Sequence, residues 1–136
     1  MLTLFAYPLI YIFEKVFGFV SDVTLMELAD SNNKLLRQLN MRAPGNFQHS
    51  LQVSKLAEEA IRAIGGNALL MRTGAMYHDI GKMNMPNYFI ENQNSDYNAH
   101  VELAPEESAA IIIEHVINGV EIAKKNKLPD IIIDFI

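Results

Sequence analysis

The residues of this chain that are best suited to metal chemistry are three histidines and one aspartate. His78 and Asp79 are adjacent in the run YHDIGK. His49 lies upstream of this pair, and His115 lies downstream. A carboxylate can bridge two cations while each neutral imidazole binds one of them. Since pairs of metal ions are typical of enzymes that cleave phosphate esters, this set of side chains predicts phosphate chemistry.

Each histidine taken singly has a simpler explanation, because a histidine on an apolar helix face is more often a hydrogen-bonded core residue than a ligand. Three inward-facing histidines from three helices, with Asp79 beside one of them, would need several buried polar partners if no metal were present. Asp79 alone could be a solvated carboxylate at a helix end, but a buried aspartate is rare unless it is paired. We therefore favour a metal centre formed by the three histidines and Asp79.

Two further residues are candidates for contact with a substrate. Lys82 lies one turn beyond Asp79, where it could be a surface lysine that binds helix carbonyls or could neutralise a phosphate oxygen as charge develops. We favour the second role, which makes Lys82 catalytic together with Asp79. His100 lies near Asn98 and Glu102 in a loop, and either a surface position or a substrate contact fits it. We count His100 among the substrate-binding candidates.

The predicted helices place the metal-binding candidates on inner faces. Apolar residues and one histidine recur at helical spacing over residues 47–64, namely His49, Val53, Leu56, Ala60 and Ile64. This pattern predicts a helix that points His49 inward and ends at Gly65 and Gly66. Asn67 predicts the N-cap of a further helix that ends near Gly81 and carries His78 on its buried face.

The remaining segments also favour helices. Ser21 or Asp22 caps a predicted helix that runs to Leu39, with a possible break over residues 30–33. Residues 83–104 lack clear periodicity, so we expect a long loop with at most short helical pieces around residues 88–90. Pro105 begins a helix whose inner face includes His115, and one more helix begins at residues 128–130. No strand-like alternation occurs, so the chain is predicted to be all-α.

Composition limits the possible functions. A chain of 136 residues fits one domain with a core of its own. Cysteine is absent, which excludes disulfides, thiolate metal sites and cysteine nucleophiles. The net charge of -5 argues against a DNA or RNA partner, because no segment concentrates lysine and arginine. A small phosphorylated ligand remains compatible with this charge.

The N-terminal segment has a different composition from the rest. Residues 2–13 (LTLFAYPLIYIF) are uncharged and rich in aromatic side chains, yet this run is shorter than the ~20 apolar residues that span a bilayer. The segment has neither the basic start nor the small-residue cleavage site that a signal peptide would have. The segment could be a buried helix, but we favour the end of a transmembrane helix over residues 1–20. An exposed apolar segment of this kind also favours association into a homo-oligomer.

The motifs together resemble those of a known family. His49, the run 77–82, and His115 followed by residues 119–121 (GVE) resemble the HD-domain metal-dependent phosphohydrolases. The stretches 41–51 (MRAPGNFQHSL), 88–93 (YFIENQ) and 128–136 (LPDIIIDFI) narrow the resemblance to the cytoplasmic domain of the bacterial seven-transmembrane HD proteins. The resemblance covers nearly the whole chain from residue 25 onward.

This resemblance implies an HD-domain helical bundle over residues 21–136 and two divalent metal ions, usually iron or manganese. It implies hydrolysis of cyclic di-AMP to the linear dinucleotide pApA by a protein anchored in the bacterial inner membrane, with the HD domain on the cytoplasmic side. His49, His78 and Asp79 match the ligands of one metal. Asp79 would bridge to a second metal that His115 helps to hold, and Lys82 matches the lysine of the HD-x-G-K motif.

The chain departs from the family pattern at its end. The family continues past residues 134–136 into a paired histidine and, later, a further aspartate. We therefore expect the HD domain here to be incomplete, with partial metal occupancy or none, and the isolated chain to be inactive. A non-catalytic HD module that binds or senses a ligand is an alternative, as is a helical domain that couples membrane helices to a partner.

Overall fold

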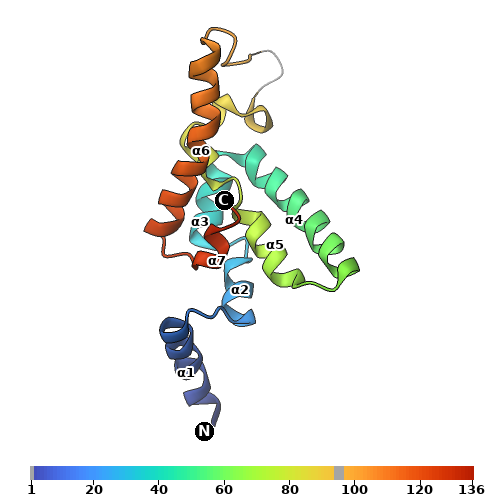
Figure 1. Ribbon diagram of the computed structural model, residues 1–136, viewed down its shortest axis with the longest axis vertical. Helices are drawn as coiled ribbons and strands as arrows, with labels where there is room; N and C mark the ends of the chain where they lie inside the picture. Colours follow the sequence, from blue (N-terminus) through green and yellow to red (C-terminus); the bar gives the residue numbers. More distant parts are fainter. Residues whose placement is uncertain (1, 94–96) are drawn as a thin grey trace.

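The computed structural model describes residues 2–93 and 97–136, and within these ranges every regular element is helical, which confirms the all-α prediction (Figure 1). The α-helices are α1 (Leu2–Phe17), α2 (Asp22–Leu28), α3 (Lys34–Arg42), α4 (Pro44–Ile64), α5 (Ala68–Tyr77), α6 (Pro105–Lys125) and α7 (Asp130–Ile133). Short 3₁₀ helices, η1 (Ile80–Asn84), η2 (Pro86–Tyr88) and η3 (Ile90–Asn92), follow α5. These pieces agree with the prediction of short helical turns around residues 88–90.

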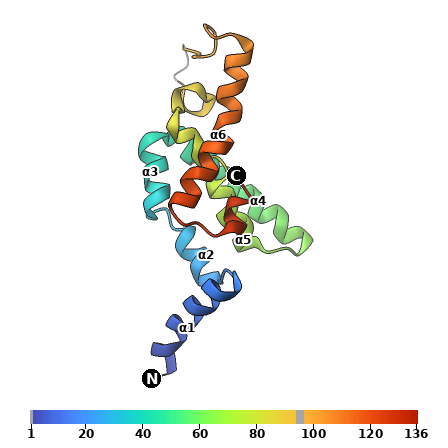
Figure 2. The ribbon, with the colours of Figure 1, turned by 60° about the vertical axis from the view of Figure 1, so that its left-hand side comes forward.

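Helix α1 extends away from the other helices (Figures 1 and 2). Its large apolar side chains from Leu4 to Phe17 are exposed. This exposure contradicts the alternative of a buried core helix. Among the described residues, none of the helices combines the length and the apolar character that crossing a membrane requires. Helix α1 contacts α2 through Glu14, whose carboxylate accepts hydrogen bonds from the Ser21 backbone N–H at 2.7 Å and the Thr24 hydroxyl at 2.8 Å.

Helices α2 and α3 supply much of the apolar core. The Ser21 side chain caps α2 by accepting from the Thr24 N–H, and Asn33 caps α3 by accepting from the Leu35 N–H. Both the predicted N-cap at Ser21 and the break over residues 30–33 are therefore confirmed. The buried core includes Leu25, Leu35, Leu36 and Leu39, together with Phe47, Met76, Tyr77, Ile80 and Ile132.

Side chains of α5 bond to the backbone of α2 and thereby hold α5 in place. The Tyr77 hydroxyl donates to the Leu28 carbonyl at 2.7 Å, and Tyr77 is 0% exposed. The Thr73 hydroxyl lies within hydrogen-bond distance of the carbonyls of Leu25 and Leu69. These bonds hold the last two turns of α5, so the residues that follow Tyr77 leave the helix at a defined place.

We expect Tyr77→Phe to destabilise the fold. The substitution keeps the buried ring but removes the donor to the Leu28 carbonyl, which lowers the free energy of unfolding by about 1 kcal/mol. Urea unfolding followed by circular dichroism measures the change. Tyr11→Phe is the matched control, because Tyr11 is 61% exposed and surface changes of this kind stay within about 0.5 kcal/mol. Equal midpoints for the two variants would contradict this role of the hydroxyl.

The predicted inner face of α4 is wrong. Leu56 is 73% exposed and Ile64 is 80% exposed, while the buried side consists of Asn46, Phe47, Ser50 and Ser54. The small serines let α4 pack closely along α5, and this contact selects a face that is rotated by about one residue from the apolar stripe. His49 consequently lies at the edge of the packed face and is only half-buried.

Candidate metal centre

The candidate ligands come from helices that meet around the end of α5. Helix α4 carries His49, α6 carries His115, and His78 and Asp79 directly follow α5. The helix was predicted to end near Gly81, but it ends at Tyr77, with His78 as its C-cap. Asp79 then leaves the helical conformation at φ -112° and precedes the tighter 3₁₀ turn of η1. The chain changes direction at Asp79, which a helical pattern alone does not predict.

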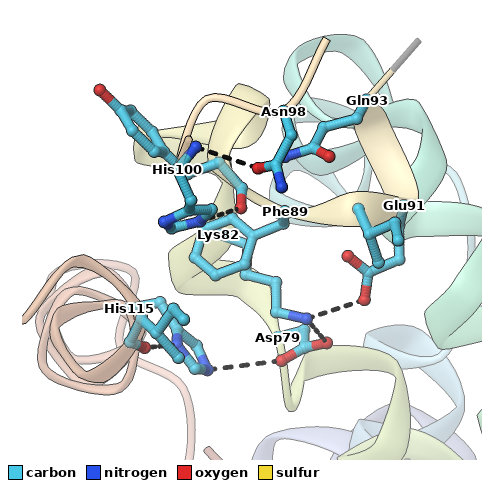
Figure 3. Close-up of a pocket in the computed structure, with 11 residues that line it drawn as sticks. Asp79, Lys82, Phe89, Glu91, Gln93, Asn98, His100 and His115 are labelled. Carbon is cyan, nitrogen blue, oxygen red and sulfur yellow. Dashed lines mark hydrogen bonds and ion pairs between the residues drawn. The ribbon is translucent and has the colours of Figure 1, made fainter. Parts of the chain in front are cut away.

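Asp79 lies between the histidines. Its Oδ2 is 3.1 Å from His78 Nε2 and 3.9 Å from His49 Nε2. Its Oδ1 instead faces His115 Nε2 at 3.6 Å (Figure 3). Asp79 is only 6% exposed, so its two oxygens serve different histidines within a largely buried site. This division is the one that a carboxylate bridging two cations requires.

His49, His78 and Asp79 offer ligand atoms that all lie within 4.8 Å of one another, which is compatible with one shared ion. The His78 ring supports this use, because its Nδ1 lies 2.7 Å from the Ala75 carbonyl, which can only accept. Nδ1 is therefore the protonated nitrogen. In the neutral ring the Nε2 lone pair then points toward Asp79, where a cation would satisfy both groups. His115 has the same arrangement, with Nδ1 on the Ile112 carbonyl.

The charges of this cluster stabilise one another. Burial raises the pKa of Asp79, but hydrogen bonds from His78, when its ring is protonated, and from Lys82 outweigh it and lower this pKa to about 2. Conversely, the hydrogen bond to Asp79 raises the pKa of His78 above its ordinary value, against the opposing effect of burial. The carboxylate is thus ionised at neutral pH, as a metal ligand must be.

Metal affinity is expected to fall as the pH decreases toward 6.5, the ordinary pKa of histidine. Because Asp79 raises the pKa of His78, a proton occupies this imidazole at a higher pH than usual, and a metal ion must displace it. Below the raised pKa the competition becomes stronger, so the apparent dissociation constant increases. Calorimetric titration with Mn²⁺ between about pH 6 and 8 measures this dependence. An affinity that stays constant over this range would contradict the assignment of His78 as a ligand.

Lys82 lies inside the site rather than on the surface. Its Nζ donates to Asp79 Oδ2 at 2.8 Å and to Glu91 Oε1 at 2.9 Å, and its side chain is only 12% exposed (Figure 3). Burial lowers the pKa of Lys82, but the hydrogen bonds to both carboxylates outweigh this effect and raise it. Glu91 was not among the predicted site residues. It is the only acidic residue of residues 83–93, which is the one sequence signal that could have indicated a partner for Lys82.

A pocket of about 390 Å³ opens beside this cluster. Its lining consists of Asp79, Lys82, Tyr88, Phe89, Ile90, Glu91, Gln93, Asn98, His100, Ile112 and His115. His100 lines the pocket, but both of its ring nitrogens are engaged. Nε2 donates to the Tyr88 carbonyl and Nδ1 accepts from the Ser108 hydroxyl, each at 2.7 Å. His100 therefore connects the loop to α6, and its contact with a substrate stays a prediction.

Close backbone contacts hold the segments that carry the site. A Cβ atom added to Gly81 would lie 1.8 Å from the His115 carbonyl oxygen and 2.6 Å from the Gly119 nitrogen. The backbones of η1 and α6 therefore touch, which brings His115 to Asp79. A Cβ atom on Gly45 would likewise lie 1.7 Å from the Glu91 carbonyl oxygen. Only glycine permits these two approaches.

Comparison with known proteins finds relatives of this chain. The chain is 47% identical over 123 residues to the cyclic-di-AMP phosphodiesterase PgpH of Listeria monocytogenes and 43% identical over 122 residues to that of Bacillus subtilis. Each alignment covers 90% of this chain but 17% of the relative.

Solved structures give the same result for the fold. The crystal structure of the L. monocytogenes phosphodiesterase PgpH HD domain matches with a TM-score of 0.74 and 48% identity, over 76% of this chain and 50% of that one. The same domain in complex with cyclic-di-AMP also matches with a TM-score of 0.74, over 77% of this chain and 49% of that one. A profile of the HD domain family covers residues 46–136. The chain therefore belongs to the HD domain family.

Proposed function

We propose that the protein containing this chain is a metal-dependent phosphodiesterase that hydrolyses cyclic di-AMP to the linear dinucleotide pApA. The observation that carries this proposal is the placement of Asp79. One of its carboxylate oxygens faces His49 and His78, and the other faces His115. Identity of 47% to a cyclic-di-AMP phosphodiesterase, over 17% of that protein, supports the choice of substrate.

The residues present fit a pair of divalent ions, and we propose iron or manganese, because imidazole and carboxylate ligands suit both. Bound ions of this kind activate water and stabilise charge on the phosphorus centre. His49, His78 and Asp79 would hold one ion, and Asp79 with His115 would contribute to the second. The Lys82 ammonium faces the same pocket, where it neutralises charge on a phosphate oxygen of the substrate.

The proposal is tested with a protein that contains the whole HD domain. We expect hydrolysis of cyclic di-AMP to pApA in the presence of Mn²⁺, measured by chromatography, and loss of turnover after chelation. Cyclic di-GMP is the matched control substrate. Hydrolysis of other cyclic dinucleotides but not of cyclic di-AMP would overturn the substrate assignment. Binding of cyclic di-AMP without turnover at any metal loading would instead favour a sensory module.

We also propose that this protein is located at the inner membrane, with the HD domain on the cytoplasmic side and α1 attached to the bilayer. The apolar side chains of α1, which include Leu4, Phe5 and Ile12, are exposed. Such a surface supports contact with the bilayer, and it would equally support association between copies of the protein. Co-flotation with lipid vesicles, compared between the chain and a version that begins at Ser21, tests the membrane contact. Light scattering of both proteins tests the homo-oligomer. Identical behaviour of the two proteins in both assays would contradict a role for α1.

A further inference from the structure

The Lys82 ammonium and a bound metal ion would use the same oxygen atom. Asp79 Oδ2 accepts from Lys82 Nζ at 2.8 Å and is also the oxygen that faces His78 and His49. An ion shared by these two histidines would repel the ammonium, because both carry positive charge and the site is largely buried. Lys82 then needs a second anion if it is to stay in the pocket.

Glu91 is the carboxylate that meets this need. Its Oε1 accepts from Lys82 Nζ at 2.9 Å (Figure 3). Burial raises the pKa of Glu91, but the hydrogen bond from Lys82 helps to outweigh this effect and lower the pKa, so Glu91 is charged at neutral pH. Lys82 Nζ also lies 5.1 Å from the centre of the Phe89 ring, which adds an attractive contact on the same segment.

The backbone around Glu91 is anchored to the helix that carries His49. The Asn92 side-chain oxygen accepts from the N–H groups of Gly45 and Asn46, at 2.9 Å and 3.3 Å, in the first turn of α4. The Glu91 carbonyl lies directly against Gly45. Because neighbouring residues fix the backbone at residues 91 and 92, the Glu91 carboxylate has a defined position relative to the metal ligands.

We propose that Glu91 is a positioning residue that keeps the Lys82 ammonium in the pocket when a divalent ion occupies Asp79. This inference rests on the proposed function, since it assigns a role within the same site. Asp79 and Glu91 share the lysine in the absence of metal, and Glu91 alone holds it once an ion binds. The ammonium then remains beside the substrate phosphate instead of turning toward solvent.

The test measures the reactivity of Lys82 in the whole protein with an amine-acetylating reagent and peptide mass spectrometry, with a chelator or with Mn²⁺. The exposed Lys55 serves as an internal reference. We expect slow acetylation of Lys82 in the wild type under both conditions. In Glu91→Gln, acetylation stays slow with the chelator but rises about tenfold with Mn²⁺, the factor that corresponds to one lost charge-assisted hydrogen bond. Glu91→Asp should restore part of the protection.

Kinetic and metal measurements complete the test. With Mn²⁺, kcat for cyclic di-AMP should fall about tenfold in Glu91→Gln, while elemental analysis finds unchanged metal content. Loss of metal in this variant would overturn the proposal, because Glu91 would then be a ligand. Acetylation of Lys82 that does not respond to Mn²⁺ in Glu91→Gln would also overturn it. If the wild type fails to hydrolyse cyclic di-AMP, the proposed function fails, whereas the acetylation rates still decide the role of Glu91.

Discussion

Asp79→Ala is expected to abolish both metal binding and hydrolysis of cyclic di-AMP in the protein that contains the whole HD domain. One carboxylate faces all three histidines, so its removal takes a ligand from both proposed ions and the negative charge that lies between them. The loss of turnover should be larger than the loss of about 10²-fold to 10³-fold that follows removal of a single transition-state contact. Chromatography of the products and elemental analysis of the purified variant measure the two losses.

Lys82→Ala is the matched control for this variant. Lys82 also contacts Asp79 Oδ2, but an ammonium binds no metal. We expect this variant to retain its metal and to lose turnover by about 10²-fold to 10³-fold, the effect of one charge-assisted contact in the transition state. Full activity of Asp79→Ala would refute the two-metal interpretation. Metal loss in Lys82→Ala would show that the lysine supports the fold of the site rather than the substrate.

Gly81→Ala is expected to separate η1 from α6 and to weaken both the fold and the metal site. The added methyl group would lie 1.8 Å from the His115 carbonyl oxygen, and a backbone atom of a long helix cannot move aside as a flexible side chain can. We expect the free energy of unfolding to fall by about 3 kcal/mol. Metal affinity should fall as well, because His115 moves away from Asp79. Urea unfolding and Mn²⁺ titration measure the two effects.

Variants at two other glycines are the controls, because they distinguish this backbone clash from the general effects of replacing a glycine. In Gly66→Ala the atoms that lie closest to the new methyl group, at 2.5 Å and 2.6 Å, belong to the side chain of Ile61, which can move. In Gly65→Ala it meets open space, but the backbone φ of +80° adds strain of about 1 kcal/mol. Neither control should change the affinity for Mn²⁺. If Gly81→Ala retained wild-type stability and affinity, the close contact between η1 and α6 would be refuted.

Local signals in the sequence predicted the helices well. Ser21 and Asn67 both cap helices by accepting backbone N–H groups at 3.3 Å and 2.9 Å, because a cap depends only on neighbouring residues. The break over residues 30–33 and the short turns around residues 88–90 follow from the same local chemistry. The structure also brings His49, His78 and His115 to Asp79, although His49 lies at the edge of a packed face of α4 that differs from the predicted one.

Features that depend on contacts between distant segments could not be predicted in this way. The stripe of residues on α4 that includes Leu56 is exposed, because packing against α5 selects the side with Ser50 and Ser54. Glu91 meets Lys82 through a turn of 3₁₀ helices, and no periodic pattern encodes that spacing. The two bonds of His100 likewise join segments whose proximity only the folded chain defines.

The distribution of the ligands over separate helices has a thermodynamic consequence. One ion held by His49, His78 and Asp79, and a second held by Asp79 and His115, would act as reversible cross-links between parts of the chain that are far apart in sequence. These ligands lie close together only after those parts have packed, so the ions bind the folded chain. Ion binding and folding are then one linked equilibrium, in which the melting temperature rises with the logarithm of the free ion concentration. Depletion of the ion would therefore weaken the helical packing itself, not only the chemistry that depends on the ion.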